Sequence, residues 1–486
     1  MTLTPHFPRT LAFTDNGYLE TSSMEMMGVV RELPAVQAAV SSAQRITAFG
    51  RRHSQGGQSL WSDARALELD HLHGVEIHRE GDGAFAVVDA GATWDDVHKR
   101  LAAYSEGRFA PRTHQSSPFF SVGGSLAVNC HGRDPRQAPI AESVRAIWLM
   151  DHRGDIQKYS RPPPRQDVPP PMRMALGGYG AGGMIVKAEI ALKPEVRLRM
   201  VDGIKTLDGY GRWIREKVEP NMVVPLHHFV HFRVGTGERL FEEGFITEGI
   251  DIGQVDPREK LQDDGLLTDD LLSVIYRKYR LSTLSERGDM WHQLQLQIGE
   301  LKASPQRQLN SMRDPVRFTQ SFPWLDDRDA QRPERRVDLM QEYFVPPGRF
   351  VEFVRRAKRI IDDAQQAHTL EMLTCTARVV QQDSTSLLNY APDVRMCFVI
   401  NFSTPFELAK AYVQEGNPLT ATMRELITAA LAVGGSYYLC YGRFATPEQF
   451  KAAYGEAAIE SFKGWRRYLD PERKFGNHFL DHYLGA

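Results

Sequence analysis

Three glycine-rich segments, at residues 50–57, 122–132 and 176–183, are the parts of this sequence best suited to bind a phosphorylated ligand. Glycine lets the backbone approach a bound group closely and point successive N–H groups at anionic oxygens. None of the segments fits G-x-G-x-x-G with an acidic residue about 20 positions on, or the G-x-x-x-x-G-K-[ST] phosphate loop. Together they predict a diphosphate cradle that is not a Rossmann nicotinamide site, although each alone is equally typical of a tight turn.

The order of motifs along the chain resembles a known family. Gly-Arg-Arg-His-Ser-Gln-Gly-Gly at 50–57 is followed by Asp-Ala-Gly-Ala-Thr-Trp at 89–94, Val-Gly-Gly-Ser-Leu-Ala-Val-Asn-Cys-His-Gly at 122–132 and Gly-Gly-Tyr-Gly-Ala-Gly-Gly at 177–183. This set resembles the vanillyl-alcohol oxidase type of FAD-linked oxidoreductase, a flavoprotein with a PCMH-type FAD-binding domain. It looks most like the sugar, alditol and aldonolactone oxidases. The likeness continues in Gln-Glu-Tyr-Phe-Val-Pro at 341–346, Asp-Pro at 470–471 and Phe-Gly-Asn at 475–477.

The resemblance implies an α+β fold, in which a two-part FAD-binding domain at residues 1–195 and 431–486 encloses an inserted α+β substrate (cap) domain at 196–430. It also implies FAD as the cofactor. The positions that match the family's cofactor segments are Gly50, Arg51, Arg52, Ser54, Gln55 and Gly56 for the diphosphate, then Ser121, Gly123, Gly124, Ser125, Asn129, His131 and Gly132, then Ile185, and Asn477 near the C-terminus.

His53 is the residue that the resemblance singles out for a covalent bond to the methyl group on the flavin's benzenoid ring. An imidazole nitrogen can add to an activated flavin methyl group, and the alkylated flavin is a stronger oxidant that cannot dissociate. The alternative is a loop histidine that only hydrogen-bonds backbone or phosphate. No cysteine occurs between Arg112 and Val122, where doubly linked relatives carry one, so we expect no second bond.

The candidate catalytic residues are Arg378, Arg443, Gln341 and Tyr343. Alcohol oxidation by a flavin needs a proton acceptor and positive charge near the substrate oxygen. Alditol oxidases provide a Glu-x-Arg pair and a later lysine; here Thr-Ala-Arg at 376–378 keeps only the arginine, and Arg443 replaces the lysine. Alternation directs Gln341 and Tyr343 to one face, which we assign to the flavin, with packed core as the alternative for Tyr343. Arg378 could equally form a structural ion pair.

The composition sets the class of protein. In 486 residues, 59 Lys and Arg face 61 Asp and Glu, so no net positive field favours nucleic acid or a membrane surface as a partner. Four cysteines without C-x-x-C spacing favour a reducing compartment. Since neither a signal peptide nor a long apolar stretch is seen, we expect a cytoplasmic protein. The histidines at 227, 228 and 231 lack a carboxylate at ligand spacing, and we expect no metal.

Short strands must position these loops. We expect strands at residues 46–50, 85–91 and 184–190, a hairpin over 144–159 and a helix that begins after Thr93. The proline-rich stretch at 161–173 predicts an extended surface loop. Helical stretches at 210–218, 266–279, 349–367 and 447–454 and a strand at 396–402 predict the α+β character of the later part of the chain.

These patterns favour an FAD-dependent oxidase or dehydrogenase that removes a hydride from a hydroxylated small molecule (a sugar, alditol or lactone), with oxygen or another acceptor reoxidising the flavin. One alternative is a tailoring oxidase of specialised metabolism that performs desaturation or oxidative cyclisation; the missing Glu-x-Arg glutamate favours it. An alternative of another class is a flavin-binding interaction or electron-transfer protein, because a fold does not fix a reaction.

Overall fold

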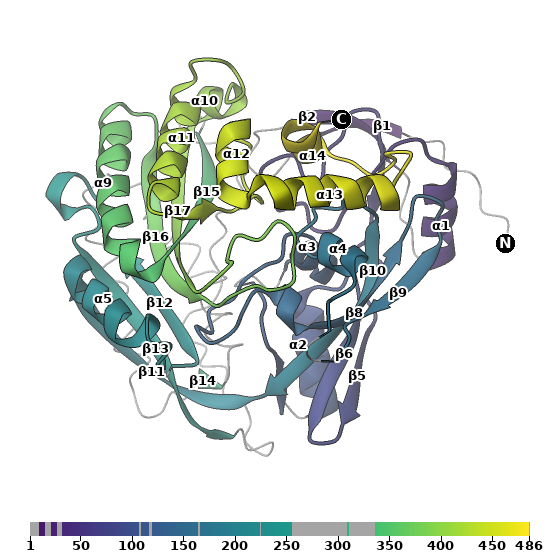
Figure 1. Cartoon of the computed structure of the whole chain (residues 1–486), viewed down its shortest axis with the longest axis horizontal. Coiled ribbons are helices and arrows are strands. Elements are labelled where there is room, and N and C mark those ends of the chain that lie inside the picture. Colours follow the sequence, from purple (N-terminus) through teal and green to yellow (C-terminus); the bar gives the residue numbers. More distant parts are fainter. Residues whose placement is uncertain are drawn as a thin grey trace.

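Three β-sheets form the framework of the computed structural model of this chain (Figure 1). The structure describes residues 9–14, 21–26, 32–105, 108–115, 119–163, 166–223, 225–254, 309–310 and 336–485. The helix that the sequence predicts at residues 266–279 lies outside these ranges.

The N-terminal region contributes two of the sheets. The first has the order β1 (Arg9–Thr14), β2 (Thr21–Met26), β4 (Arg65–Glu68), β3 (Ile46–Phe49). The second has the order β5 (Val75–Glu80), β6 (Gly83–Asp89), β10 (Met184–Pro194), β8 (Val144–Met150), β9 (Ile156–Ser160), with β7 (Phe109–Pro111) paired to β10. Helices α1 (Leu33–Ser42), α2 (Trp94–Ser105), α3 (Val122–Ala127) and α4 (Pro170–Ala175) belong to the same region.

Local polar contacts explain the predicted turn and helix start. The Asp151 carboxylate accepts from the backbone N–H groups of Arg153 and Asp155, at 2.8 and 3.0 Å, and Gly154 has a φ of +87°. The hairpin β8–β9 therefore turns where the sequence predicts it. At the start of α2, the Thr93 hydroxyl accepts from Asp96 N–H at 3.2 Å while the Asp96 carboxylate accepts from Thr93 N–H at 2.9 Å.

The proline-rich stretch differs from its prediction as a wholly extended loop. Its second proline triplet leads into helix α4, in which Pro170 and Pro171 occupy the first two positions. Proline suits the first turn of a helix because its fixed φ is helical and the missing N–H has no acceptor there. The apolar residues that follow, including Met172, are buried, and this burial favours the helix.

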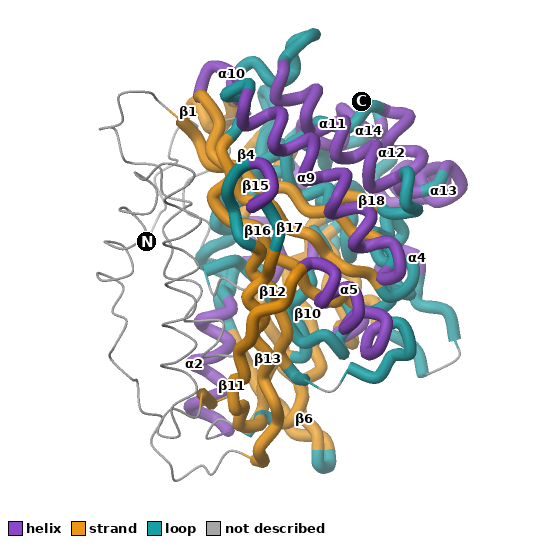
Figure 2. Tube along the Cα trace, turned by 90° about the vertical axis from the view of Figure 1, so that its left-hand side faces the viewer, coloured by secondary structure: helices purple, strands orange, loops and turns teal. Residues whose placement is uncertain are grey.

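The third sheet has eight strands and forms the other half of the molecule. Its order is β14 (Leu309–Asn310), β11 (Val196–Thr206), β13 (Glu243–Gln254), β12 (His227–Phe232), β16 (Glu371–Val380), β17 (Arg395–Pro405), β15 (Arg336–Val345), β18 (Ser436–Tyr437). Helices α5 (Leu207–Trp213, continued by a wider turn, Ile214–Val218), α9 (Phe350–Gln366), α10 (Phe406–Lys410) and α11 (Pro418–Leu431) accompany it. Figure 2 shows α5 and α9 on one side of these strands.

The helix-covered face of this sheet is an apolar core. Phe353 of α9 packs on Tyr343 of β15 and on Phe398 of β17, with both ring centroids 5.5 Å away. Because successive side chains of a strand point to opposite faces, Glu342 and Phe344 project from the other face. That other face meets the N-terminal region, where Phe344 contacts the ring of His131 at 5.3 Å.

The C-terminal segment returns from the third sheet to the N-terminal region. Helices α12 (Pro447–Tyr454), α13 (Glu456–Leu469) and α14 (His478–Leu484) follow one another, and α13 crosses between the two halves in Figure 1. The N–H of Ile46 in β3 donates to the carbonyl of Lys474 at 2.8 Å, and Gly476 N–H donates back to Ile46 at 3.2 Å. Residues far apart in sequence thus complete one unit.

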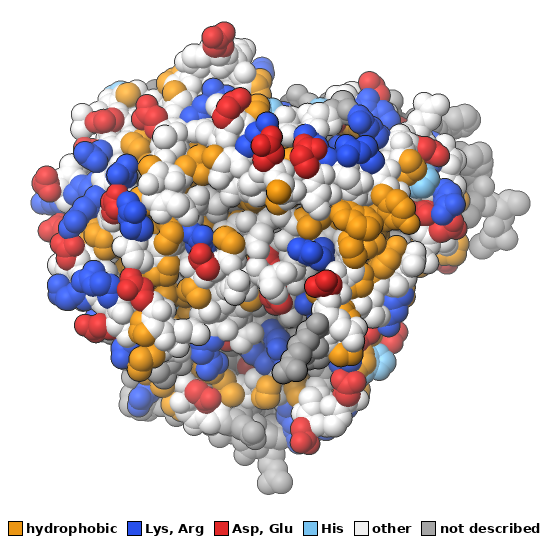
Figure 3. All heavy atoms as spheres, viewed as in Figure 1, with side chains coloured by type: hydrophobic (Ala, Val, Ile, Leu, Met, Phe, Trp, Pro, Cys, Tyr) orange, Lys and Arg blue, Asp and Glu red, His pale blue; other side chains and the backbone are white. Residues whose placement is uncertain are grey.

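Surface charges of both signs are interspersed on the face shown in Figure 3. No helix within the described ranges is long and apolar enough to cross a membrane.

A buried polar junction joins the N-terminal region to the loop between β16 and β17. The side-chain amide of Asn129 donates to Asp383 at 2.9 Å, and Asp383 also accepts from the backbone N–H of Thr385 at 2.8 Å. Tyr390 donates its hydroxyl to the carbonyl of Asn129 at 2.7 Å. These bonds hold Asn129 at a φ of +51°, a conformation that asparagine tolerates better than most residues.

Replacing Asp383 with alanine should lower the melting temperature. The variant removes the carboxylate that accepts from the Asn129 amide and from the buried Thr385 N–H, at a cost of about 1–3 kcal/mol for a buried group left without an acceptor. We expect Asp383→Ala to melt several degrees below the parent protein in a thermal scan. Glu415→Ala, at an exposed position, serves as the matched control. An unchanged melting temperature for Asp383→Ala would show that the junction is not stabilising.

Candidate functional site

The loop at residues 50–57 lies against the start of the second glycine-rich segment and against the C-terminal part of the chain. A Cβ on Gly50 would overlap the hydroxyl of Ser121, and one on Gly56 would overlap the carbonyl of Tyr441. Gln55 reaches strand β15, where its side-chain carbonyl accepts from Met340 N–H at 3.0 Å. The glycines at 50 and 56 therefore permit close contact with the second glycine-rich segment and with the C-terminal part of the chain.

The basic residues of this loop are partly engaged. Arg51 pairs with Asp70 at 2.9 Å and Arg52 with Glu68 at 3.8 Å. His53 is half-buried, with its ring edge-on to Phe120 at 4.9 Å. Burial, together with the positive charge of Arg51, lowers the pKa of His53 to about 4. Its imidazole is therefore neutral at physiological pH.

The second segment forms helix α3 and the loop after it. Ser121 caps the helix by accepting from Gly124 N–H at 3.3 Å. Gly123 is tightly packed, since a Cβ there would come within 2.7 Å of the Ala90 side chain and 2.9 Å of its carbonyl. At Gly124 a Cβ would meet only the Ser121 hydroxyl, at 3.0 Å. Among the glycines of this helix, Gly124 is thus the one that leaves room beside the backbone.

Several predicted cofactor residues use their side chains within the protein. Ser125 contacts Trp94 and Gln115, and Asn129 holds the junction with Asp383. Asn477 caps α14 by accepting from Leu480 N–H at 2.9 Å, and its amide donates to the Tyr179 carbonyl at 2.9 Å. Ile185 is buried in β10, and a Cβ on Gly132 would come within 3.2 Å of the His114 carbonyl. Their predicted contacts with a cofactor stay predictions.

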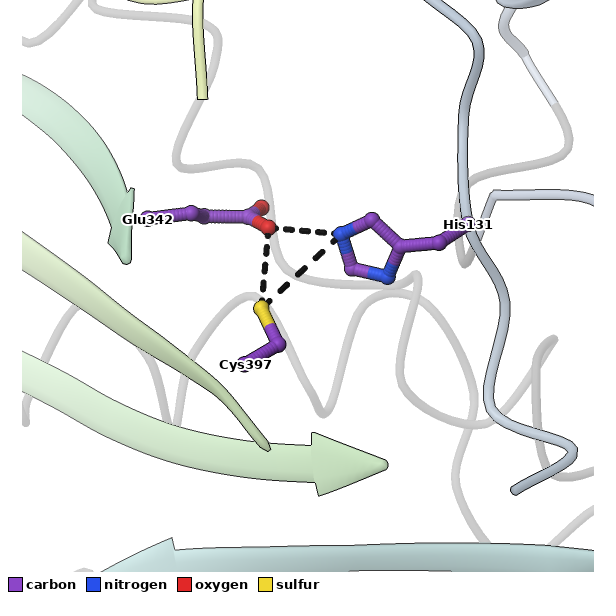
Figure 4. A group of neighbouring side chains, drawn as sticks. All are labelled: His131, Glu342 and Cys397. Carbon is purple, nitrogen blue, oxygen red and sulfur yellow. Dashed lines mark hydrogen bonds and ion pairs between the residues drawn. The ribbon is translucent and has the colours of Figure 1, made fainter. Parts of the chain in front are cut away.

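A buried hydrogen bond joins the second segment to the eight-stranded sheet. The Nε2 atom of His131 lies 2.7 Å from Glu342 of β15, and the two residues are 5% and 4% exposed. The other carboxylate oxygen of Glu342 accepts from the Tyr441 hydroxyl at 2.6 Å. Figure 4 shows His131 reaching from its loop toward Glu342 and Cys397. This pair lies where the two halves of the molecule meet.

The sheet register places further polar residues beside Glu342. Glu342 pairs with Val399, Val399 with Thr376, and Thr376 with His231, so these four residues form one row across the face. In the next row, Cys397 is paired with both Phe344 and Arg378. Arg378 is therefore on the same face as Glu342, and its Nε is buried without a hydrogen-bond partner among the described residues.

The residues around Glu342 determine the pKa of its carboxyl group. Burial alone would raise the pKa of Glu342, but the charge and hydrogen bond of His131, the charge of Arg378 and the hydrogen bond of Tyr441 lower it to about 2. Glu342 is therefore ionised at neutral pH. Cys397 lies 3.2 Å from Glu342, and burial raises the pKa of its thiol well above the usual range. His131, Glu342 and Cys397 offer the atoms of a metal ligand set, and in this structure they form a hydrogen-bonded cluster.

The structure brings one of the four predicted catalytic residues, Arg378, into this cluster. Gln341 and Tyr343 lie on the helix-covered face, and Tyr343 is fully buried against Phe353, which agrees with the packed-core alternative for Tyr343. A flavin contact of either residue stays a prediction. Arg443 donates to the Tyr412 hydroxyl at 3.1 Å and to the His478 carbonyl at 3.0 Å, and so ties the C-terminal segment together.

The residues that the sequence reasoning missed are Glu342, Tyr441 and Arg133. A glutamate within the apolar stretch Leu339–Val345 was the available signal, because a charged residue in a buried strand needs a partner. Arg133 follows the glycine-rich segment directly, and its guanidinium lies 4.5 Å above the Phe229 ring. Nothing local to Arg133 or Tyr441 distinguishes either residue from an ordinary loop residue.

Comparison with known families identifies the N-terminal region. Residues 31–160 match the family model described as FAD binding domain. The chain contains an FAD-binding domain. The match includes His53, helix α3 and His131, and it confirms FAD as the cofactor that the sequence predicted.

Relatives match the same part of the chain. The chain is 31% identical over 173 residues to cytokinin dehydrogenase 6 of Oryza sativa subsp. japonica, which covers 34% of this chain and 31% of that protein. It is 27% identical over 162 residues to D-arabinono-1,4-lactone oxidase of Eremothecium gossypii, covering 33% of this chain and 29% of that protein. The chain thus matches about a third of the length of these relatives.

A solved structure extends the likeness to the whole fold. The crystal structure of cholesterol oxidase from B. sterolicum matches with a TM-score of 0.66 at 12% sequence identity, over 99% of both chains. The comparison confirms the predicted α+β fold of the vanillyl-alcohol oxidase type. The domain limits at 1–195, 196–430 and 431–486 stay predictions, although the sheets change between β10, which ends at Pro194, and β11, which begins at Val196.

The residues at this site fit a flavin nucleotide. The backbone at Gly124 has room beside it, and His114 Nε2 is a buried polar atom without a partner among the described residues. Buried polar groups normally have a hydrogen-bond partner, so such atoms indicate a missing ligand.

Replacing Gly124 with valine should separate cofactor binding from folding. A side chain at this position meets little protein but occupies the room beside the backbone, so we expect soluble, folded Gly124→Val protein with little FAD. Flavin absorbance per protein and a thermal scan measure the two properties. Gly123→Val is the matched comparison, and it should fold poorly because its side chain would collide with Ala90. Full flavin occupancy in Gly124→Val would make this segment an ordinary turn.

Proposed function

We propose that this protein is an FAD-dependent oxidoreductase that oxidises a hydroxylated small molecule and passes the electrons to oxygen or another acceptor. The observation that carries the proposal is the buried cluster of His131, Glu342 and Arg378, placed where the FAD-binding domain meets the polar face of the eight-stranded sheet. The relatives described above are dehydrogenases and oxidases, which supports the same class of reaction.

The reaction divides between cofactor and protein. FAD, when bound, would supply a hydride acceptor for the substrate carbon, and a protein group would take the hydroxyl proton. In our proposal His131 takes that proton: its Nε2 is bonded to Glu342, and its Nδ1 has no partner among the described residues. A carboxylate on one ring nitrogen fixes the tautomer and stabilises the imidazolium that forms. Tyr441 holds the carboxylate in place.

Arg378 provides positive charge on the same sheet face. A fixed guanidinium next to a developing alkoxide stabilises the transition state more in a buried site than in water. The threonine at position 376 lies beside Val399 in the row of Glu342. The Glu342 carboxylate, donated by a different strand, is therefore our proposed substitute for the glutamate that the Glu-x-Arg pattern lacks.

A substrate screen tests the activity. Yellow purified protein would be mixed anaerobically with hydroxylated compounds, flavin bleaching would be followed, and peroxide would be measured after air is readmitted. We expect bleaching by at least one compound class. Flavin that is stable to the entire panel would contradict the enzyme proposal and leave a flavin-binding protein.

Replacing Glu342 with glutamine should slow flavin reduction without releasing FAD. The amide keeps the shape of the side chain but cannot stabilise a protonated His131, and we expect a loss of about a hundredfold or more in the single-turnover rate. Since the pKa of Glu342 is about 2, titration of this residue should not change the rate of flavin reduction in the parent enzyme between pH 5 and 9. Glu407→Gln, exposed on α10, is the control. An unchanged rate in Glu342→Gln would remove the pair from the reaction.

The ionised carboxylate of Glu342 should stabilise the folded protein at neutral pH. A carboxylate whose pKa is lower in the folded than in the unfolded protein stabilises the fold above its unfolded pKa, here 4.5. That contribution is lost as the pH falls from 4.5 toward 2, so acid unfolding of Glu342→Gln should depend less on pH in this window.

We further propose that His53 bonds covalently to the flavin. The neutral imidazole has a free electron pair at pH 7, because its pKa is about 4. After acid precipitation, the flavin should stay with the parent protein and should be released from His53→Ala. His78→Ala, on the exposed part of β5, should behave like the parent. A colourless parent precipitate would exclude the bond.

A further inference from the structure

Two arginines at the polar face of the eight-stranded sheet, the buried Arg133 and the partly buried Arg378, lack a carboxylate partner among the described residues. Arg133 is 9% exposed, and its Nε and one terminal nitrogen have no hydrogen-bond partner there. Arg378 contributes a buried, unpartnered Nε. Arginines with little exposure are normally paired, because an uncompensated buried charge is costly. This pair therefore differs from the paired arginines at positions 51 and 145.

The fold holds the two guanidinium groups near each other. In the β12–β16 ladder Val230 pairs with Ala377, so Phe229, which precedes Val230, stands next to Arg378 on the same face. Arg133 lies over the ring of Phe229, at 4.5 Å. Its backbone is fixed as well, since the Arg133 carbonyl accepts from His228 N–H at 3.0 Å.

The two cations repel each other. Burial and the charge of Arg378 together lower the pKa of Arg133 well below its ordinary value. Glu342 compensates only in part, because its oxygens are already bonded to His131 and Tyr441. Thr376, two residues before Arg378 on the same face, brings no charge. An anion that entered between the arginines would relieve the repulsion and satisfy the unpartnered nitrogens.

We propose that the substrate is a hydroxylated anion, whose carboxylate or phosphate group binds between Arg133 and Arg378. This inference rests on the proposed function and narrows it, from hydroxylated small molecules in general to hydroxy acids or phosphorylated sugars and alcohols. Guanidinium groups suit both anions because their planar donors bind two oxygens at once. The diphosphate of FAD is assigned to another element, the loop at residues 50–56.

Anion binding to the FAD-loaded protein tests the proposal without turnover. Acetate and inorganic phosphate would be titrated separately, with chloride holding the ionic strength constant. The readouts are the flavin absorption spectrum and the melting temperature. We expect a saturable change with at least one anion, and the stronger response would indicate whether a carboxylate or a phosphate is preferred.

Matched variants locate the binding site. Loss of a charge-assisted hydrogen bond in Arg133→Met or Arg378→Met should weaken anion binding by about 10- to 100-fold. Arg133→Lys and Arg378→Lys keep the charge, and their affinities should fall between those of the parent and the methionine variants. Arg355→Met, on the outer surface of α9, should bind as the parent does. If a methionine variant does not fold, its lysine counterpart decides, and an affinity equal to the parent's would contradict the proposal.

Three other outcomes would overturn the inference. They are no saturable response to either anion, an equal response in the parent and both methionine variants, and loss of FAD from both variants while Arg355→Met keeps it. The last result would assign the arginines to the cofactor. Flavin bleaching by a neutral alcohol without anion binding would refute this inference alone. Saturable anion binding without reduction by any hydroxylated anion would refute the proposed oxidoreductase activity and leave an anion site.

Discussion

The buried carboxylate of Glu342 constrains how the two halves of this molecule meet. Glu342 stands on a strand whose neighbouring residues are almost fully buried, and an ionised group in such a place is stable only with partners of opposite charge and good geometry. The partners come from different parts of the chain: His131 from the FAD-binding domain and Tyr441 from the segment after β18. Displacing the sheet from the domain would leave this charge uncompensated, which makes their relative position specific as well as stable.

The register of β15 is the condition for that arrangement. One face of the eight-stranded sheet packs on α5, α9 and α11 through aromatic residues, and the other carries Glu342, Thr376, Arg378 and His231. A slip of one residue would move Glu342 into the apolar helix layer and Tyr343 into the polar face. The dense ring packing around Phe353 and Phe398 makes such a slip costly. The apolar layer thus fixes the geometry of the polar one.

Sequence reasoning found the features that depend on local pattern. The glycine-rich loops, the Thr93 cap, the β8–β9 hairpin and the FAD-binding domain all follow from residues close together in the chain. The helix in the proline-rich stretch was missed because Pro170 and Pro171 suit a first helical turn as well as an extended segment.

Local sequence pattern could not predict which face of the eight-stranded sheet is polar. Residues 341–344 are all buried, so alternation identifies two faces without telling which one the helices cover. Because of that ambiguity, sequence reasoning proposed Gln341 and Tyr343, and not Glu342, as candidate catalytic residues. Arg133 and Arg378 become neighbours only through the pairing of β12 with β16, a contact between segments more than 100 residues apart in the chain.

The return of the C-terminal segment has a consequence for how the chain acquires its structure during synthesis. Ile46 exchanges backbone hydrogen bonds with Lys474 and Gly476, and the indole of Trp61 donates to Asp481 at 2.8 Å. The edge of the first sheet at β3 therefore lacks its final neighbours until more than 400 further residues have been translated. Contacts so distant in sequence close slowly, and the nascent N-terminal region exposes apolar surface in the meantime. The first sheet can thus be completed only after the segment that carries Lys474 and Gly476 has been synthesised.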